Sequence, residues 1–243
     1  MAENEHNIRK IFPEIIADYK GVFGDDLVSI TMYGSATGRD YRPGKSDVNF
    51  MIVLSESGIE HLDQAFSIVR KWKKRNVAIP LFLTETYIDT SMDVFPIEYL
   101  NFQRNNMVIF GKDILCDLSF KPEFIRLQCE REIKGKLLLL REAFIETEGK
   151  GKGLKDVISQ SVLSFIAVFE ALLHIKGKKI PNDKRGVIQA TCTTFDLDVN
   201  VFERLLDIKE EKFKLNNEEL LRLYKYYLAE VRKLSKLVDT LGD

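Results

Sequence analysis

Two short segments constrain the fold of this chain more than any others: residues 33–35 (Tyr-Gly-Ser) and residues 46–50 (Ser-Asp-Val-Asn-Phe). The first ends a stretch, 27–33, whose β-branched and aromatic residues are typical of a strand. The second opens an apolar stretch that also predicts a strand. Side chains alternate along a strand, so Asp47 and Asn49 point to one face and the residues between them point to the other. The sequence therefore predicts two strands joined through a glycine–serine turn, with two oxygen-bearing side chains at the start of the second.

The turn at Gly34 and Ser35 is suited to binding phosphate. Glycine lets the backbone approach a phosphate closely, serine adds a hydroxyl, and free N–H groups at the start of a helix favour an anion. Asp47 and Asn49 offer oxygen ligands, and magnesium commonly bridges such ligands to substrate phosphates. The two segments together predict a site for a polyphosphate and a divalent cation.

The order of strand, Gly34-Ser35, loop and Asp47-Val48-Asn49 resembles the nucleotidyltransferase superfamily typified by polymerase β and the kanamycin nucleotidyltransferases. That family has Gly-Ser after a strand, then Asp-x-Asp or Asp-x-Glu on the next strand and a third acid on a later strand. Gly34, Ser35 and Asp47 match this pattern, whereas Asn49 stands where the family has its second acid. The resemblance covers about residues 25–115.

The resemblance implies an α+β fold, with a mixed sheet and flanking helices holding the site. It also implies a nucleoside triphosphate as substrate or ligand and Mg²⁺ as cofactor, bound by Asp47 and Asn49. The expected reaction transfers a nucleoside monophosphate to a hydroxyl of a small-molecule or protein acceptor. Gly34 and Ser35 are then expected to hold the triphosphate.

The set of acids is incomplete in the sequence. Two-metal phosphoryl transfer uses clustered carboxylates, and the amide of Asn49 carries no charge, so we expect a single-metal site with weakened activation of the acceptor hydroxyl. The expected third strand, 77–83, contains no acid, but Glu85 follows it and Glu98 lies in the apolar segment 95–102. Either acid could complete the site as ligand or general base, or both could be structural. Glu98 is preferred because an acid inside an apolar segment needs a partner.

Three basic residues, Arg39, Arg42 and Lys45, lie in the loop between the two segments. They could contact the triphosphate or the pyrophosphate leaving group, as basic side chains do in phosphoryl transfer, or they could form a solvated loop. The family often has Gly-Ser-x-Ala-x-Gly here, and this chain, with Gly-Ser-Ala-Thr-Gly-Arg, is one residue shorter.

Composition limits the classes of partner. The chain has 36 Lys and Arg against 37 Asp and Glu, a net charge of −1, so we expect neither nucleic acid nor an anionic membrane as partner. Its three cysteines are widely spaced, which predicts neither a disulfide framework nor a zinc site and fits the cytoplasm. The polar N-terminus does not resemble a signal peptide, and the longest apolar run, 162–173, is too short to span a bilayer.

The second half of the chain has a different pattern. Strand signals nearly vanish after residue 120, and apolar residues recur at helical spacing, which predicts an all-α bundle. We expect a nucleotidyltransferase-like domain over 1–118 and a helical bundle over 119–243. The expected helices of the bundle cover 124–146, 154–175, 183–194, 199–209 and 217–241.

The sequence also allows two functions without catalysis. The same pocket could sense or store a nucleotide, or the fold could serve only as the scaffold of an antitoxin-like interaction protein. The base of the nucleotide, the acceptor and the oligomeric state are left open by the residues.

Overall fold

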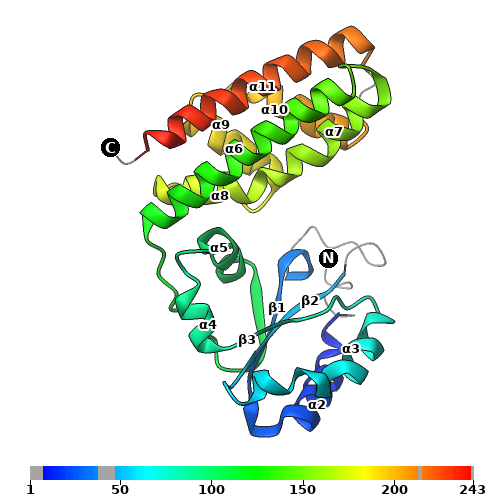
Figure 1. Ribbon diagram of the computed structural model, residues 1–243, viewed down its shortest axis with the longest axis vertical. Coiled ribbons are helices and arrows are strands. Elements are labelled where there is room, and N and C mark those ends of the chain that lie inside the picture. The colour runs from blue at the N-terminus through cyan, green and yellow to red at the C-terminus, as the bar shows by residue number, and fades with distance from the viewer. Residues whose placement is uncertain (1–7, 38–46, 213–214, 242–243) are drawn as a thin grey trace. The chain divides into compact units, whose positions relative to one another are not determined.

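The computed structural model describes residues 8–37, 47–212 and 215–241 (Figure 1). The chain divides into two compact units, Met1–Ser119 and Phe120–Asp243. The first unit contains a four-stranded sheet, and the described part of the second contains helices only. The α+β architecture with an all-α C-terminal part, which the sequence predicts, is confirmed.

The sheet of the first unit is mixed, with strand order β3-β2-β1-β4. The central strand β1 (Leu27–Tyr33) pairs antiparallel with β2 (Asn49–Leu54) and with β4 (Asn106–Gly111). The edge strand β3 (Leu81–Leu83) pairs parallel with β2. The expected third strand, 77–83, is shorter than predicted because Pro80 has no N–H to donate to a ladder. Only Val77 forms a further bridge, with Val48.

One face of the sheet packs on the apolar core. Ile30 and Met32 of β1 pair with Ile52 and Phe50 of β2, and all four are buried together with side chains of the helices on this face. The other face carries Tyr33, whose ring lies 4.7 Å from that of Phe102. The unit's helical segments are α2 (Phe12–Phe23), η1 (Gly24–Asp26), η2 (Gly34–Thr37), η3 (Gly58–Ala65), α3 (Phe66–Lys73), α4 (Glu85–Thr90) and α5 (Pro96–Arg104).

The second unit is built from α6 (Pro122–Glu146), α7 (Gly151–Ser164), α8 (Ile166–Ile175), α9 (Lys184–Thr194), α10 (Val199–Lys209) and α11 (Asn217–Asp239). The expected continuous helix 154–175 is instead two helices that meet at Phe165. The hydroxyls of Ser161 and Ser164 donate to Ile158 O (3.3 Å) and Ser161 O (2.7 Å). Such bonds compete with the backbone ladder and bend helices, which accounts for the break.

Aromatic side chains fill the centre of the bundle. Tyr227 contacts Phe165 and Phe202. The hydroxyl of Tyr224 donates to Leu140 O at 2.7 Å. Burial raises the pKa of Tyr224 to about 12. Among the described helices, the stretch Gly151–Ile175 is long and apolar enough to cross a membrane, by length and composition alone. Core helices of soluble proteins have the same properties, and 44% of its most apolar window is buried.

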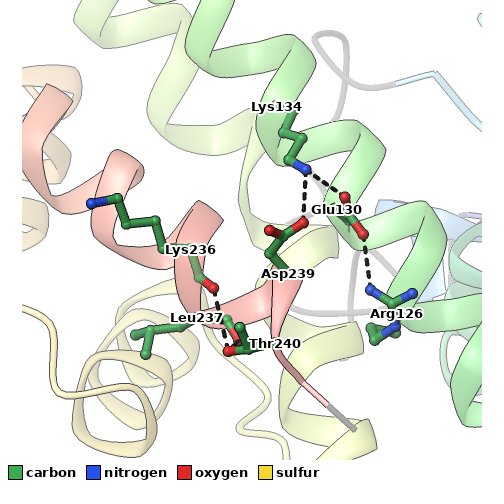
Figure 2. Close-up of polar contacts among 7 residues, drawn as sticks. All are labelled: Arg126, Glu130, Lys134, Lys236, Leu237, Asp239 and Thr240. Atoms are coloured by element: carbon green, nitrogen blue, oxygen red, sulfur yellow. Dashed lines mark hydrogen bonds and ion pairs between the residues drawn. The ribbon is translucent and has the colours of Figure 1, made fainter. Parts of the chain in front are cut away.

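Helices α6 and α11 are joined at their surfaces by charged residues (Figure 2). Lys134 of α6 donates to Asp239 of α11 at 2.8 Å and to Glu130 of its own helix at 2.5 Å. Glu130 also accepts from Arg126 at 2.8 Å. This contact fixes the end of α11 against the middle of α6.

Candidate functional site

The turn after β1 depends on Gly34. Its φ of +79° lies in the left-handed region, which glycine adopts without the steric cost that a Cβ would bring. Its N–H donates to Asn105 O at 3.1 Å, and its carbonyl accepts from Thr37 Oγ1 at 2.8 Å. The turn is therefore fixed to the start of β4 on one side and closed on itself on the other.

The two halves of the sequence motif meet at this turn. Tyr33 and Asn49 are opposite each other in the β1–β2 ladder. A Cβ placed on Gly34 would lie 3.5 Å from Asn49 Nδ2, so the Asn49 side chain lies against Gly34. The β1–β2 ladder ends at the pair of Tyr33 and Asn49, so Ser35 and Asp47 each lie two residues beyond it, Ser35 after β1 and Asp47 before β2. The glycine–serine turn and the Asp-x-Asn segment thus occupy the same edge of the sheet.

Two polar groups at this edge remain available to a ligand. Ser35 and Asp47 are both exposed, while Gly34 and Asn49 are partly buried. Among the described residues, neither the Ser35 hydroxyl nor the Asp47 carboxylate has a hydrogen-bond or ion-pair partner. The hydroxyl and the carboxylate of the motif are therefore both exposed to solvent.

Glu85 lies at the opposite end of the sheet from Asp47. Strands β2 and β3 run parallel with Val53 opposite Leu83, so Glu85 follows the end of the pair whereas Asp47 precedes its start. A strand of the length of β2 spans about 20 Å. The Glu85 carboxylate also forms an ion pair with Lys112 at 2.6 Å. Glu85 therefore does not complete the site around Asp47.

Glu98 lies on α5, which packs on the sheet face that also carries Asn49. Glu98 precedes Phe102 by one helical turn, so both residues are on the same side of α5. The ring of Phe102 contacts Tyr33, which is the ladder partner of Asn49. The Glu98 side chain is exposed rather than enclosed by the apolar segment, because the segment forms a helix and turns it outward. Glu98 is therefore on the helix that covers this face, but its carboxylate is turned to solvent, and its role as the third acid stays a prediction.

No protein-family model matches the sequence, and no curated protein matches it. In structure, the chain is similar to spectinomycin adenyltransferase AAD(9) from Enterococcus faecialis, which was crystallised with ATP and spectinomycin. The similarity has a TM-score of 0.50 at 15% sequence identity and covers 90% of this chain and 98% of that one. This chain has a nucleotidyltransferase fold. The fold expected from the motif at Gly34 and Asp47 is therefore confirmed.

Three residues that were predicted to contact the phosphates lie outside the described residues. They are the basic residues of the loop, Arg39, Arg42 and Lys45. Their assignment to the phosphates stays a prediction from the sequence.

The segment beside Asn49 carries no third acid. Val48 N donates to Asn76 O, and Ala78 N donates to Val48 O, both at 3.0 Å, so residues 76–80 run beside the start of β2. These five residues are Asn, Val, Ala, Ile and Pro. In this nucleotidyltransferase fold, the neighbouring strand therefore offers no carboxylate to Asp47.

The donor set fits one magnesium ion better than two. Asp47 supplies a carboxylate and Asn49 an amide, and the described residues contain no group of three His, Cys, Asp or Glu side chains placed to hold a metal. Magnesium is commonly held by one or two carboxylates together with substrate phosphates and water. Asp47 and Asn49 therefore fit an ion that arrives with a triphosphate, and do not fit a second ion.

Sequence reasoning missed the residues that support the turn. The Asn106 side chain donates to Phe102 O (2.9 Å) and Gln103 O (3.0 Å), which closes the end of α5, and Asn106 is the ladder partner of Tyr33 in β4. Burial against α5 raises the pKa of the Tyr33 hydroxyl. The pair Asn105-Asn106 between two apolar stretches was the available signal, since asparagine is common where a helix ends.

Proposed function

We propose that this chain binds a nucleoside triphosphate with magnesium at the edge formed by Gly34, Ser35, Asp47 and Asn49, and transfers its nucleoside monophosphate to an acceptor hydroxyl. The placement of the Asn49 side chain against Gly34 supports this most strongly, because it shows that two segments distant in sequence share one edge. The similar structure contains ATP and a small molecule, spectinomycin, which favours a small-molecule acceptor over a protein.

Each residue has a role in this proposal. The Ser35 hydroxyl and the backbone N–H groups of the turn hold the phosphates, and Arg39 and Lys45 neutralise the leaving group. Asp47 and the amide oxygen of Asn49 hold magnesium, which, when bound, offsets negative charge on the phosphates.

The reaction is a displacement at the α-phosphorus of the triphosphate. The acceptor oxygen forms the new bond, the bond to pyrophosphate breaks, and Glu98 takes the proton of the acceptor hydroxyl. Because Asn49 adds no charge and only one ion fits, we expect turnover to be slow relative to a site with two acids.

A second candidate is a nucleotide-binding or antitoxin-like interaction protein without catalysis. The incomplete set of metal-binding acids among the described residues favours it. Binding of magnesium and triphosphate would then be retained, while acceptor transfer would be absent. For both candidate functions we propose a cytoplasmic location, since Cys116, Cys129 and Cys192 are all free thiols.

Calorimetry and pyrophosphate release separate the candidates. ATP, GTP, CTP and UTP are titrated with and without magnesium, and pyrophosphate is then measured with a panel of hydroxyl-bearing acceptors that includes spectinomycin. The enzyme is supported if the nucleotide binds in a magnesium-dependent way and pyrophosphate is released. That pyrophosphate release should be lost in Asp47→Ala and retained in Glu85→Ala. Binding without release supports the sensor, and absence of binding for all four nucleotides contradicts both nucleotide-binding functions.

A further inference from the structure

Helix α6 has large apolar side chains on two sides. Its inner side is buried and includes Ile125, Cys129, Ile133, Leu137 and Leu140. Its outer side also carries four large apolar side chains, Leu127, Leu138, Leu139 and Ile145, which are 57%, 57%, 64% and 76% exposed. A surface helix normally has polar residues on its outer side, and four such residues on one helix form a face rather than scattered exceptions.

Gly135 lies within this outer face. A Cβ at this position would meet no atom within 4 Å, so nothing in the chain requires its absence. Glycine inside a helix is destabilising relative to alanine, which makes a glycine without a packing reason informative. A missing side chain on an apolar helix face lets another helix approach closely.

The charges on the outer face are unevenly satisfied. Lys134, at the edge of this face, is engaged by Glu130 and Asp239 (Figure 2). In contrast, Arg131 and Glu142 form no ion pair or hydrogen bond with any described residue. They are eleven residues apart, close to three helical turns, so both project from the same side of α6.

Two pairs of positions on this face are symmetric along the helix. The midpoint between Arg131 and Glu142 is also the midpoint between Gly135 and Leu138. If a second α6 lies antiparallel across this midpoint, Arg131 of each copy faces Glu142 of the other, and Leu138 of each copy lies over Gly135 of the other. A parallel arrangement would place Arg131 against Arg131, and like charges oppose it.

We propose that this chain forms a two-fold symmetric dimer in which two copies of α6 pack antiparallel through this outer face. The occupant of the face is a second copy because the Arg131/Glu142 and Gly135/Leu138 pairs are complementary to themselves, which is the requirement of an isologous interface. Each interface contains two Arg131–Glu142 pairs and two Leu138–Gly135 contacts, flanked by Leu127, Leu139 and Ile145.

Sedimentation equilibrium of the full chain tests the proposal through a charge swap. The wild-type chain is expected to dimerise with concentration. Arg131→Glu and Glu142→Arg should each raise the dimer dissociation constant about tenfold or more, because each creates like-charge contacts twice per dimer. The double variant Arg131→Glu with Glu142→Arg should restore the wild-type constant, and Lys152→Glu on α7 serves as the charge control.

Gly135→Leu gives a readout that a purely structural glycine would not. We expect the variant to melt at a higher temperature as a folded monomer, because leucine favours a helix, and to lose the dimer, because the new side chain meets Leu138 of the other copy. A chain that sediments as a monomer at every concentration overturns the proposal. A dimer that ignores the single charge reversals, or that the double swap fails to restore, also overturns it.

Discussion

The two ends of the β1–β2 pair carry similar residues in opposite states. At one end, Asp26 accepts hydrogen bonds from Ser55 (2.5 Å) and Ser57 (2.7 Å). At the other end, Ser35 follows β1 and Asp47 precedes β2, and neither side chain has a partner among the described residues. This contrast separates a structural carboxylate from one that is available to a ligand. The hydrogen-bonding capacity of Asp26 is used by its own chain, whereas that of Asp47 is not used by any described residue.

The largest expected effect comes from removing the two aspartates in turn. Asp47→Ala should weaken magnesium-dependent triphosphate binding about 100-fold or more, because it removes the one carboxylate that fits the metal. Asp26→Ala should leave that binding unchanged while lowering the urea midpoint of unfolding. Calorimetry and urea denaturation on both variants measure the contrast, and equal loss of binding in both would break it.

A smaller gain is expected from Asn49→Asp, which restores the charge that the nucleotidyltransferase pattern has at this position. We expect the magnesium concentration for half-saturation to fall about tenfold and pyrophosphate release to rise, because a second carboxylate favours the cation. Thr90→Asp on α4 adds the same charge at a position outside the motif and should change neither quantity. An unchanged magnesium requirement in Asn49→Asp would place the metal elsewhere.

Replacing the glycine of the turn should cause a modest loss of stability. Gly34→Ala should destabilise the chain by about 1–2 kcal/mol, because alanine is strained at a φ of +79°. Gly21→Ala, within α2 and with no atom within 4 Å of the added Cβ, should instead stabilise it by up to about 1 kcal/mol. Urea denaturation compares the two, and a neutral Gly34→Ala would show that the turn is not held in this conformation.

The smallest effect concerns acid. The hydrogen bonds from Ser55 and then Ser57 lower the pKa of Asp26 in the folded chain below its usual value. Its contribution to stability is therefore present above about pH 4 and is lost as the pH falls through the folded value. As the pH is lowered below about 4, the urea midpoint of the wild-type chain should fall more steeply than that of Asp26→Asn. Parallel curves would show that these hydrogen bonds do not distinguish the ionised form.

Local sequence was sufficient for the two strands that flank the candidate site. The strand before Gly34 and the alternation that sets Asn49 against Val48 both depend on neighbouring residues. The bounds of α10 (Val199–Lys209) were also predicted, because an apolar stripe and an aspartate cap at Asp198 are local signals.

Other features depend on contacts that local sequence does not contain. The sequence favoured Glu98 but left Glu85 possible, and only the parallel register of β2 and β3 placed Glu85 at the far end of the sheet. The break at Phe165 depends on serine hydroxyls that bond within the helix rather than to solvent. The outer face of α6 could not be separated from its inner face, because apolar residues are spaced for helix on both sides.

A crystal structure with magnesium and a non-hydrolysable triphosphate tests the central claim most directly. We expect the phosphates at the turn of Gly34 and Ser35, with the cation bound to Asp47. Nucleotide bound at the opposite end of the sheet, near Ser55 and Glu85, or nucleotide at the Gly34 edge with Asp47 turned away from the cation, would contradict it.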